Sequence, residues 1–64
     1  MFEVTGIYLN EFPIKGILIN RWKTLNRDDA YRVKLKEPQL FFGSYHNEVI
    51  LVGNDLIEIK EIIL

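Results

Sequence analysis

Ser44 and His46 are the residues of this 64-residue chain whose types could support nucleophilic catalysis. They are two residues apart, so both side chains could face the same way on an extended strand. Asp55 or Glu48 could then complete a hydrolytic triad by residue type. The surrounding sequence shows neither a nucleophile elbow nor a signature of an oxyanion hole, and Ser, His and Asn are ordinary turn residues. We therefore expect no catalytic residues and no enzymatic activity.

The spacing of the residues does not indicate a site for a metal ion or a phosphate group. One His, no Cys and scattered carboxylates give no ligand pattern for a metal. Asp28 and Asp29 adjoin in a predicted turn, where they could hold a cation weakly, but a solvated turn explains them better. The glycines, at positions 6, 16, 43 and 53, form no phosphate-binding loop. The sequence predicts neither a metal site nor a cofactor.

The strongest candidate binding surface is the stretch 12–36, which holds seven of the eight basic residues and the only Trp. Its seven basic and two acidic residues give a charge of +5, whereas 1–11 carries −2 and 37–64 carries −4. The chain is therefore bipolar along its sequence, although its net charge is only −1. Within it, residues 14–36 read as a hairpin. We expect its partner-binding side chains to be Arg21, Trp22, Lys23, Arg27, Tyr31, Arg32, Lys34 and Lys36.

Two classes of partner fit this hairpin, a protein and a nucleic acid. If its strands pair, one outer surface would carry Arg21, Lys23, Arg32, Lys34 and Lys36, with Arg27 at the tip. Such surfaces bind nucleic acid through basic groups on phosphates and aromatic rings stacked on bases. They also steer charged proteins, and the anchors of a protein interface would come from Phe12, Trp22, Phe41, Phe42 and Tyr45, most of which we expect in the core. We favour a protein partner; exposure of Trp22 and Tyr31 would favour nucleic acid.

The C-terminal segment is more apolar than one edge of a small barrel requires. Its apolar residues are Leu56, Ile57, Ile59, Ile62, Ile63 and Leu64. They could pack on the core, or form a dimer interface by strand addition or helix docking. We expect Ile59, Ile62, Ile63 and Leu64 to mediate any self-association of the chain.

The elements that position these residues read as short strands separated by turns. The predicted strands are 2–9, 14–25, 31–36, 39–45 and 48–52, and the predicted turns are 10–13, 26–30, 37–38 and 45–47. The segment 31–36 alternates clearly, with apolar residues inward and basic residues outward. The long second strand is apolar along neither parity, which indicates a kink or bulge at Gly16 or Asn20. Pro13 should bend the chain rather than lie within the sheet.

The last two elements are less regular. The apolar run in 48–52 predicts a strand buried on both faces. Residues 53–55 read as a turn or one short helical turn, and for 56–64 we favour a strand over a helix. The terminal segments are expected to pair with each other or with the second strand, which would remove sticky edges.

Five or six short antiparallel strands in so short a chain predict an all-β fold, a single-domain SH3-like or OB-like barrel spanning 1–64. The hydrophobic fraction of 48% favours a packed core over disorder. No apolar run is long enough to span a membrane, and the N-terminus lacks the basic start of a signal peptide. We therefore expect a soluble, cytoplasmic protein.

A set of glycines, prolines and apolar positions recurs in a known group of proteins. The shared elements are Thr5-Gly6-x-Tyr8, Pro13-x-x-Gly16, Arg21, Tyr31-x-Val33-x-Leu35-x-x-Pro38, Phe42-Gly43 and Val49-x-Leu51-Val52. Over most of its length the chain resembles small uncharacterised phage-encoded β-barrel proteins, from which its isoleucine-rich tail departs. The resemblance implies a phage or mobile-element origin and brings no catalytic residues. We expect an accessory or inhibitory protein that binds a host protein in the bacterial cytoplasm.

Overall fold

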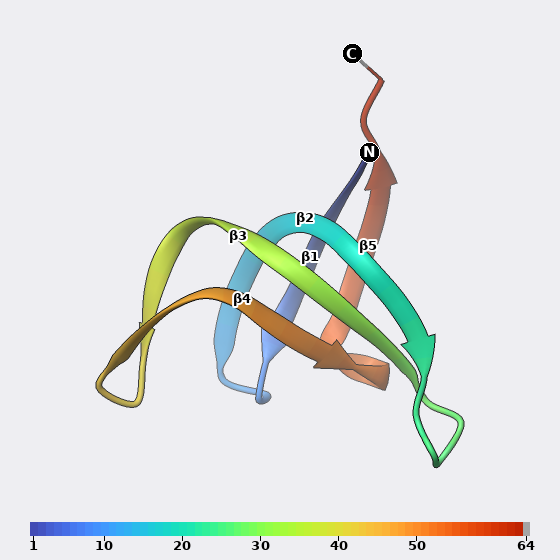
Figure 1. Cartoon of the computed structure of the whole chain (residues 1–64), viewed down its shortest axis with the longest axis horizontal. Helices are drawn as coiled ribbons and strands as arrows, with labels where there is room; N and C mark the ends of the chain where they lie inside the picture. The colour runs from blue at the N-terminus through green and yellow to red at the C-terminus, as the bar shows by residue number, and fades with distance from the viewer. Residues whose placement is uncertain (64) are drawn as a thin grey trace.

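A five-stranded antiparallel sheet in the order β4-β3-β2-β1-β5 makes up the structure (Figure 1). This computed structural model describes residues 1–63. The strands are β1 (Phe2–Tyr8), β2 (Phe12–Lys23), β3 (Asp29–Phe41), β4 (Ser44–Val52) and β5 (Leu56–Glu61), and a 3-10 turn, η1 (Gly53–Asp55), joins the last two. The prediction of one small all-β domain with antiparallel strands is confirmed.

Alternating side chains place one face of the sheet in the core. In β3, Tyr31, Val33 and Leu35 are buried, while Arg32 and Lys34 between them are exposed. This confirms the alternation predicted for 31–36. The buried cluster consists of Val4, Ile14, Tyr31, Val33, Leu35, Phe41, Val49 and Leu51. Within residues 1–63 no polar or charged residue is buried, so the core is stabilised by apolar packing.

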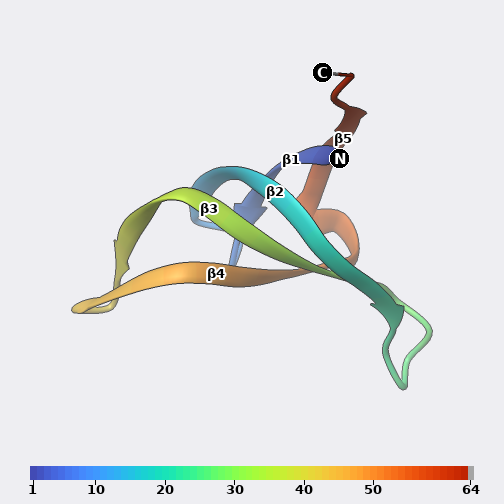
Figure 2. The same cartoon turned by 45° about the horizontal axis from the view of Figure 1, so that its top comes forward.

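β2 is curved (Figure 1) and changes its pairing partner at Gly16, so it belongs to both halves of a curled sheet. Its first half pairs with β1, and its second half, from Gly16 onward, pairs with β3. A Cβ atom at Gly16 would overlap the carbonyl oxygen of Lys34, so the absence of a side chain is what lets the two backbones approach. Figures 1 and 2 show the consequence: the β1–β5 pair runs at a steep angle to β3 and β4.

A second close approach, at Gly6, brings β1 against parts of the chain that are not its neighbours in the sheet. A Cβ atom there would lie 2.5 Å from the carbonyl oxygen of Asp55 in η1 and 2.6 Å from Cδ1 of Leu51 in β4. β1 and β4 are three positions apart in the strand order. Their contact therefore means that the sheet folds back over its own core.

A β-bulge interrupts β2 beyond the bend. The register shifts between Leu18 and Asn20, which pair with consecutive residues of β3, so Ile19 is the extra residue. The side-chain oxygen of Asn20 accepts a hydrogen bond from the backbone N–H of Arg21 at 2.8 Å. The prediction of a kink or bulge at Gly16 or Asn20 is confirmed by the bulge beside Asn20.

Two hairpin turns lie at positions other than those predicted. The β1–β2 turn is centred on Leu9 and Asn10 (φ 53° and 58°) instead of 10–13, and the β3–β4 turn on Phe42 and Gly43 (φ 51° and 82°) instead of 45–47. Positive φ at both central residues is the pattern of a type I′ turn, which matches the twist of paired strands. Bulky residues such as Leu and Phe disfavour this conformation, which is why the sequence did not reveal these turns.

Neither proline ends a strand, contrary to the prediction. Pro13 lies in β2 opposite Ile7, and Pro38 lies in β3. The predicted strands 31–36 and 39–45 are therefore one strand, β3, plus the turn and start of β4. Between Lys34 and Gln39 the β3–β4 register is irregular, so Pro38 removes no ladder hydrogen bond there.

β4 is an edge strand with one buried face. Val49 and Leu51 are buried, whereas Ile50 and Val52 are 42% and 38% exposed. The prediction that 48–52 is buried on both faces is wrong, because an antiparallel sheet with nothing packed on its outer side leaves that face in water. The predictions for the following residues are confirmed in part: 53–55 form one short helical turn, and the strand predicted for 56–64 spans 56–61 and pairs with β1, whereas 62–63 lie beyond it.

Replacing Gly16 with Ala should destabilise the protein by about 2 kcal/mol, because overpacking typically costs roughly 1–3 kcal/mol and the obstructing atom belongs to backbone. Urea denaturation followed by Trp fluorescence measures the loss. Gly53→Ala is the control for a glycine in open space. Its φ of 58° should cost about 1 kcal/mol of backbone strain, but no atom lies within 4 Å of the new Cβ. A loss at Gly16 no larger than that at Gly53 would contradict the role given to Gly16.

Candidate interaction surfaces

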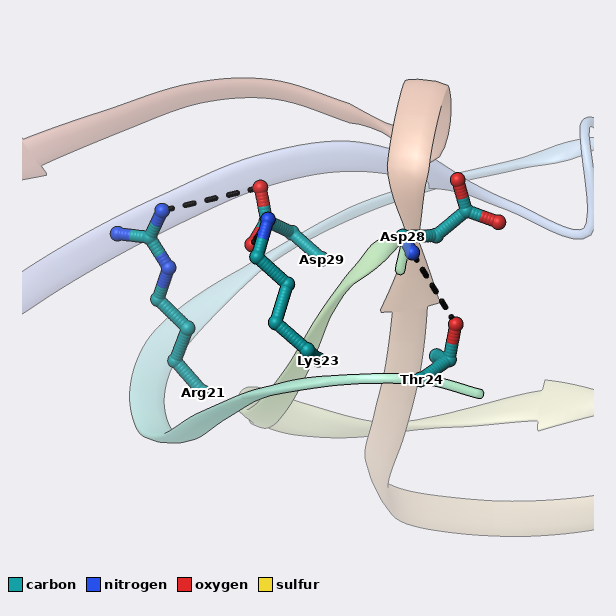
Figure 3. Close-up of polar contacts among 5 residues, drawn as sticks. All are labelled: Arg21, Lys23, Thr24, Asp28 and Asp29. Atoms are coloured by element: carbon teal, nitrogen blue, oxygen red, sulfur yellow. Dashed lines mark hydrogen bonds and ion pairs between the residues drawn. The ribbon is translucent and has the colours of Figure 1, made fainter. Parts of the chain in front are cut away.

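The β2–β3 hairpin projects from the sheet as a structured loop (Figures 1 and 3). The backbone N–H of Thr24 donates to the carbonyl of Asp28 at 2.9 Å, and the N–H of Arg27 donates to the carbonyl of Thr24 at 2.9 Å. The N–H of Asp28 donates to Oγ1 of Thr24 at 3.2 Å. Leu25 at the tip is fully exposed. The hairpin therefore presents an ordered end to solvent, with Arg27 beside an unprotected apolar side chain.

The structure divides the predicted basic surface between two faces of the hairpin. Arg21 pairs with Tyr31 and Lys23 pairs with Asp29, so these two basic residues share the face that leads into the core. Trp22, opposite Ala30, lies on the other face, as do Arg32, Lys34 and Lys36, which alternate with the buried residues of β3. The expectation of one surface carrying all five basic residues is wrong. The bulge at Ile19 is the reason, because one extra residue reverses the side on which the rest of β2 points.

Asp29 organises the inner face of the hairpin. Its carboxylate accepts a hydrogen bond from Lys23 Nζ at 3.0 Å and forms an ion pair with the Arg21 guanidinium at 3.8 Å (Figure 3). A hydrogen bond from Lys23, with the charges of Lys23 and Arg21, lowers the pKa of Asp29 despite partial desolvation. The guanidinium of Arg21 also lies 5.4 Å from the centre of the Tyr31 ring. Both cations are therefore engaged within the hairpin.

The two aromatic residues of the predicted binding site differ in exposure. Tyr31 is only 5% exposed and belongs to the core, so it cannot stack on a base. Trp22 is 38% exposed and covers the buried Ala30 opposite it. Of the predicted pair, only Trp22 can reach a ligand.

The fold also mixes the charges that are separated along the sequence. Glu3 of β1 accepts Lys36 Nζ at 2.9 Å and Lys15 Nζ at 3.4 Å, and Glu48 of β4 accepts Arg32 at 3.3 Å. The hydrogen bond from Lys36, supported by Lys15, lowers the pKa of Glu3. Because β1 and β4 flank the basic strands, the positive pole of the sequence does not become a uniformly positive face.

A groove of about 630 Å³ opens where β2 and β3 diverge. It is lined by Thr5 and residues 13–15 on one side and by residues 36–39 on the other. The ion pairs of Glu3 with Lys15 and Lys36 join its two sides. Pro13 and Pro38 leave gaps in the backbone donors along the groove, so a ligand here would be held by side chains rather than by adding a strand.

Four large apolar side chains are exposed at or next to the β1–β2 and β3–β4 turns, whose positions Figure 1 shows. We use the name turn-end surface for these four residues, Leu9, Leu40, Phe42 and Tyr45, which are exposed by 52%, 54%, 75% and 74%. Leu40 and Tyr45 pair across β3 and β4. The ring of Phe42 packs edge-on against Phe12, with centroids 5.4 Å apart, which connects the two turns. This surface combines several aromatic and aliphatic side chains.

An aromatic cluster beneath this surface fixes the two turns to the core. Phe41, which is 2% exposed, contacts the rings of Phe12, Tyr8 and His46 at centroid distances of 4.9, 5.1 and 5.6 Å. Such tilted aromatic contacts are worth about 0.5–1.5 kcal/mol each beyond area burial. The exposed side chains above are therefore held on a rigid base.

Sequence reasoning found only part of the turn-end surface. Phe42 and Tyr45 were among the predicted interface anchors, whereas Leu9 and Leu40 were not. Leu9 and Phe42 are each followed by a residue that tolerates positive φ, Asn10 and Gly43. That pairing was the available signal for two type I′ turns at this end of the fold.

The residues considered for catalysis are not assembled into a triad. Ser44 and His46 both lie in β4, and the His46 ring packs on Phe41. Glu48 is paired with Arg32, and Asp55 lies in η1. Among residues 1–63 no hydrogen bond joins any two of these four side chains, and no cluster of three potential metal ligands occurs.

The C-terminal residues predicted for self-association differ in burial. Ile59 is half-buried and packs on the core, Ile62 is half-buried, and Ile63 is 89% exposed. Leu64 lies outside the described residues.

No helix in the described part of the chain is long and apolar enough to cross a membrane.

Comparisons with protein-family models, curated proteins and solved structures found no match. The resemblance to phage-encoded proteins therefore stays a prediction.

Glu3→Gln should remove a pH dependence of stability. The folded-state pKa of Glu3 is lowered, so its ion pairs stabilise the protein above the ordinary Glu pKa of about 4.3 and this contribution is lost as pH falls through the lower folded value. Wild type should therefore lose stability between about pH 5 and pH 3 more steeply than the variant. Thermal unfolding across this range is the measurement, and parallel curves for the two proteins would refute the expectation.

Proposed function

We propose that this protein is a non-enzymatic protein-binding module and that the turn-end surface contacts its partner. The observation that carries the proposal is the exposure of Phe42 and Tyr45, by 75% and 74%, together with that of Leu9 and Leu40, by 52% and 54%. Large exposed apolar patches on monomeric proteins mark interaction sites, and at these two turns two aromatic and two aliphatic side chains are exposed. Aromatic side chains are the commonest anchors of protein interfaces.

Backbone conformation adds support at two of these positions. Leu9 and Phe42 have φ of 53° and 51°, a region that costs a residue with a side chain about 1–2 kcal/mol. Gly or Asn would occupy these turn positions with less strain. Bulky apolar residues in a strained and exposed conformation are better explained by binding than by stability.

The finer fold that we propose is a small SH3-like barrel, with an OB-like barrel as the alternative. The contact of β1 with β4 and η1 at Gly6 supports a sheet that curls towards closure. The four consecutive strands followed by a 3-10 turn and a last strand beside β1 fit this arrangement. In such a barrel the turns at one end form a continuous rigid surface for a partner.

The partner that we propose is a host protein. The resemblance to phage-encoded proteins implies an accessory or inhibitory role in the bacterial cytoplasm. A module of this size would inhibit by covering a surface of its target. The mixed charges around Glu3 and Glu48 would tune the rate of association rather than supply most of the affinity.

Nucleic-acid binding by the β2–β3 hairpin is the second candidate function. The specific observation in its favour is Trp22, 38% exposed on a projecting hairpin that also carries Arg21, Lys23 and Arg27. The exposed side chains of Arg32, Lys34 and Lys36 lie on the adjoining strand. Against it stand the burial of Tyr31 and the pairing of Arg21 and Lys23 with Asp29.

Phe42→Asn should raise stability by about 0.5 kcal/mol while abolishing partner binding. Asn tolerates positive φ, which recovers about 1 kcal/mol of strain, and the loss of the ring contact with Phe12 offsets roughly half of this gain. Urea denaturation measures stability. Retention of bacterial lysate proteins on the immobilised chain, identified by mass spectrometry and repeated with the purified candidate, measures binding.

The matched control for this experiment is Leu25→Ser, which removes a fully exposed apolar side chain from the β2–β3 hairpin. It should bind the partner as wild type does. If Leu25→Ser loses the partner and Phe42→Asn keeps it, the basic hairpin is the binding site and the turn-end surface is not.

For the second candidate, single-stranded oligonucleotides should quench Trp22 fluorescence at low salt, and the effect should weaken as salt rises. Arg27→Ala should reduce the affinity, whereas Lys60→Ala, far along the chain on β5, should not. Unchanged Trp22 emission at low salt with both DNA and RNA would remove nucleic acid as a partner.

A further inference from the structure

β5 is an edge strand whose outer side has no partner among residues 1–63. It pairs with β1 alone and ends the strand order (Figures 1 and 2). The backbone N–H of Ile62 donates to the carbonyl of Met1 at 2.8 Å, on the β1 side. Backbone N–H and C=O groups of successive residues point to alternate sides of a strand. Those of Lys60 and Glu58 therefore face β1, and those of Ile59 and Glu61 face the free edge.

The order of charges along this edge is self-complementary. In an antiparallel pair of two β5 strands centred on Ile59, Glu58 of each copy lies opposite Lys60 of the other. The two Ile59 residues then form a hydrogen-bonded pair, since their backbone groups face the free edge. The Glu58–Lys60 pairs become non-hydrogen-bonded pairs, in which opposing side chains lie closer together.

Both charges are available for this contact. Glu58 and Lys60 are exposed, and they lie opposite Thr5 and Glu3 in the β1–β5 register. Within residues 1–63 neither takes part in an ion pair; Glu3, which lies opposite Lys60, is paired with Lys15 and Lys36. Each side chain can therefore turn towards a second copy.

Other registers of the same pair are unfavourable. Moving the centre by one residue along the strand places either two Glu58 or two Lys60 side chains directly opposite each other. Like charges in opposing positions destabilise a strand pair. The charges thus specify one register, which the backbone alone would not do.

We propose that two copies of this chain associate through antiparallel pairing of their β5 strands, centred on Ile59, with reciprocal Glu58–Lys60 ion pairs. The contact joins the two sheets into one by edge addition and is isologous, as two-fold symmetry requires. The exposed side chain of Ile63 lies at its margin. The bulge at Ile57, between the pairs Thr5–Glu58 and Gly6–Leu56, limits the paired length, so the dimer is weak.

This association is independent of the proposed binding function. The β3–β4 turn, which carries Phe42 of the turn-end surface, lies at the opposite end of the molecule from β5 (Figure 1). It stays free in the dimer, so each dimer presents two such surfaces. A partner with two copies of its own epitope would then be bound with increased avidity.

Charge reversal tests the register. Sedimentation velocity on wild type should show a monomer–dimer equilibrium with a Kd of about 10 μM to 1 mM, the range of small interfaces. Glu58→Lys and Lys60→Glu should each weaken self-association roughly tenfold, because two attractive pairs become repulsive. An equimolar mixture of the two variants should form a heterodimer, since each of its two cross-strand contacts again joins a positive side chain to a negative one. Its affinity should be within about threefold of wild type.

Folding is monitored in parallel because Lys60→Glu places a carboxylate opposite Glu3 within its own chain. Glu58→Lys faces only Thr5, and Lys60→Gln removes the ion pairs without adding repulsion, so these two test the contact even if Lys60→Glu unfolds. A monomeric wild type at about 1 mM would overturn the proposal, since even a weak interface is populated there. So would single variants that dimerise like wild type, or a mixture of folded variants that does not associate.

Discussion

The approach of two backbones at Gly16 is the constraint on which the rest of this fold depends. A side chain there would overlap the carbonyl oxygen of Lys34, so β2 can pass from β1 to β3 only because position 16 has none. Gly6 plays the same part where β1 meets Leu51 and Asp55. Together they let a five-stranded sheet fold over its apolar side chains. A chain of this length needs that curvature because its core is small.

The bulge at Ile19 has the second largest consequence, because it decides which side chains share a face. In the part of β2 that precedes Ile19, side chains alternate regularly between the two faces of the sheet, in step with those of β3. After it, Arg21 and Lys23 point to the side of Tyr31 and Asp29, while Arg32 and the lysines of β3 point to the other. The basic residues are therefore split and partly neutralised by Asp29, Glu3 and Glu48. The partner surface proposed above is therefore the apolar turn-end surface, in which Phe42 packs on Phe12 and Phe12 on the buried Phe41.

Strain and edge exposure are informative in so small a protein because each is disfavoured by stability alone. Phe42 keeps an aromatic side chain in a left-handed conformation on the surface. Among residues 1–63 the outer edge of β5 is unpaired and carries alternating charges, although edges are usually covered, shortened or blocked by proline. The first feature supports a partner of different sequence, and the second supports a second copy of the chain. Both are surface properties that a stable monomer would not require.

Patterns within single segments were enough to predict the fold class, the irregularity of β2 and the strand at 56–61. They also predicted the inward residues Tyr31, Val33 and Leu35. These features were predictable because alternation and β-branched content depend on local geometry. Two turns were misplaced, since Leu9 and Phe42 are residues that rarely adopt positive φ. Pro13 and Pro38 were misjudged as well, because a proline is tolerated where it removes no ladder hydrogen bond.

The surfaces, by contrast, followed from contacts between segments. One extra residue in β2, Ile19, reverses the direction of its later side chains, and this divides the basic residues between two faces. Neighbouring strands bring Glu3 and Glu48 from distant positions in the chain beside the basic stretch. The register of a strand and the identity of its neighbours are set by pairing across the sheet. They therefore cannot be predicted from the residue pattern of one strand alone.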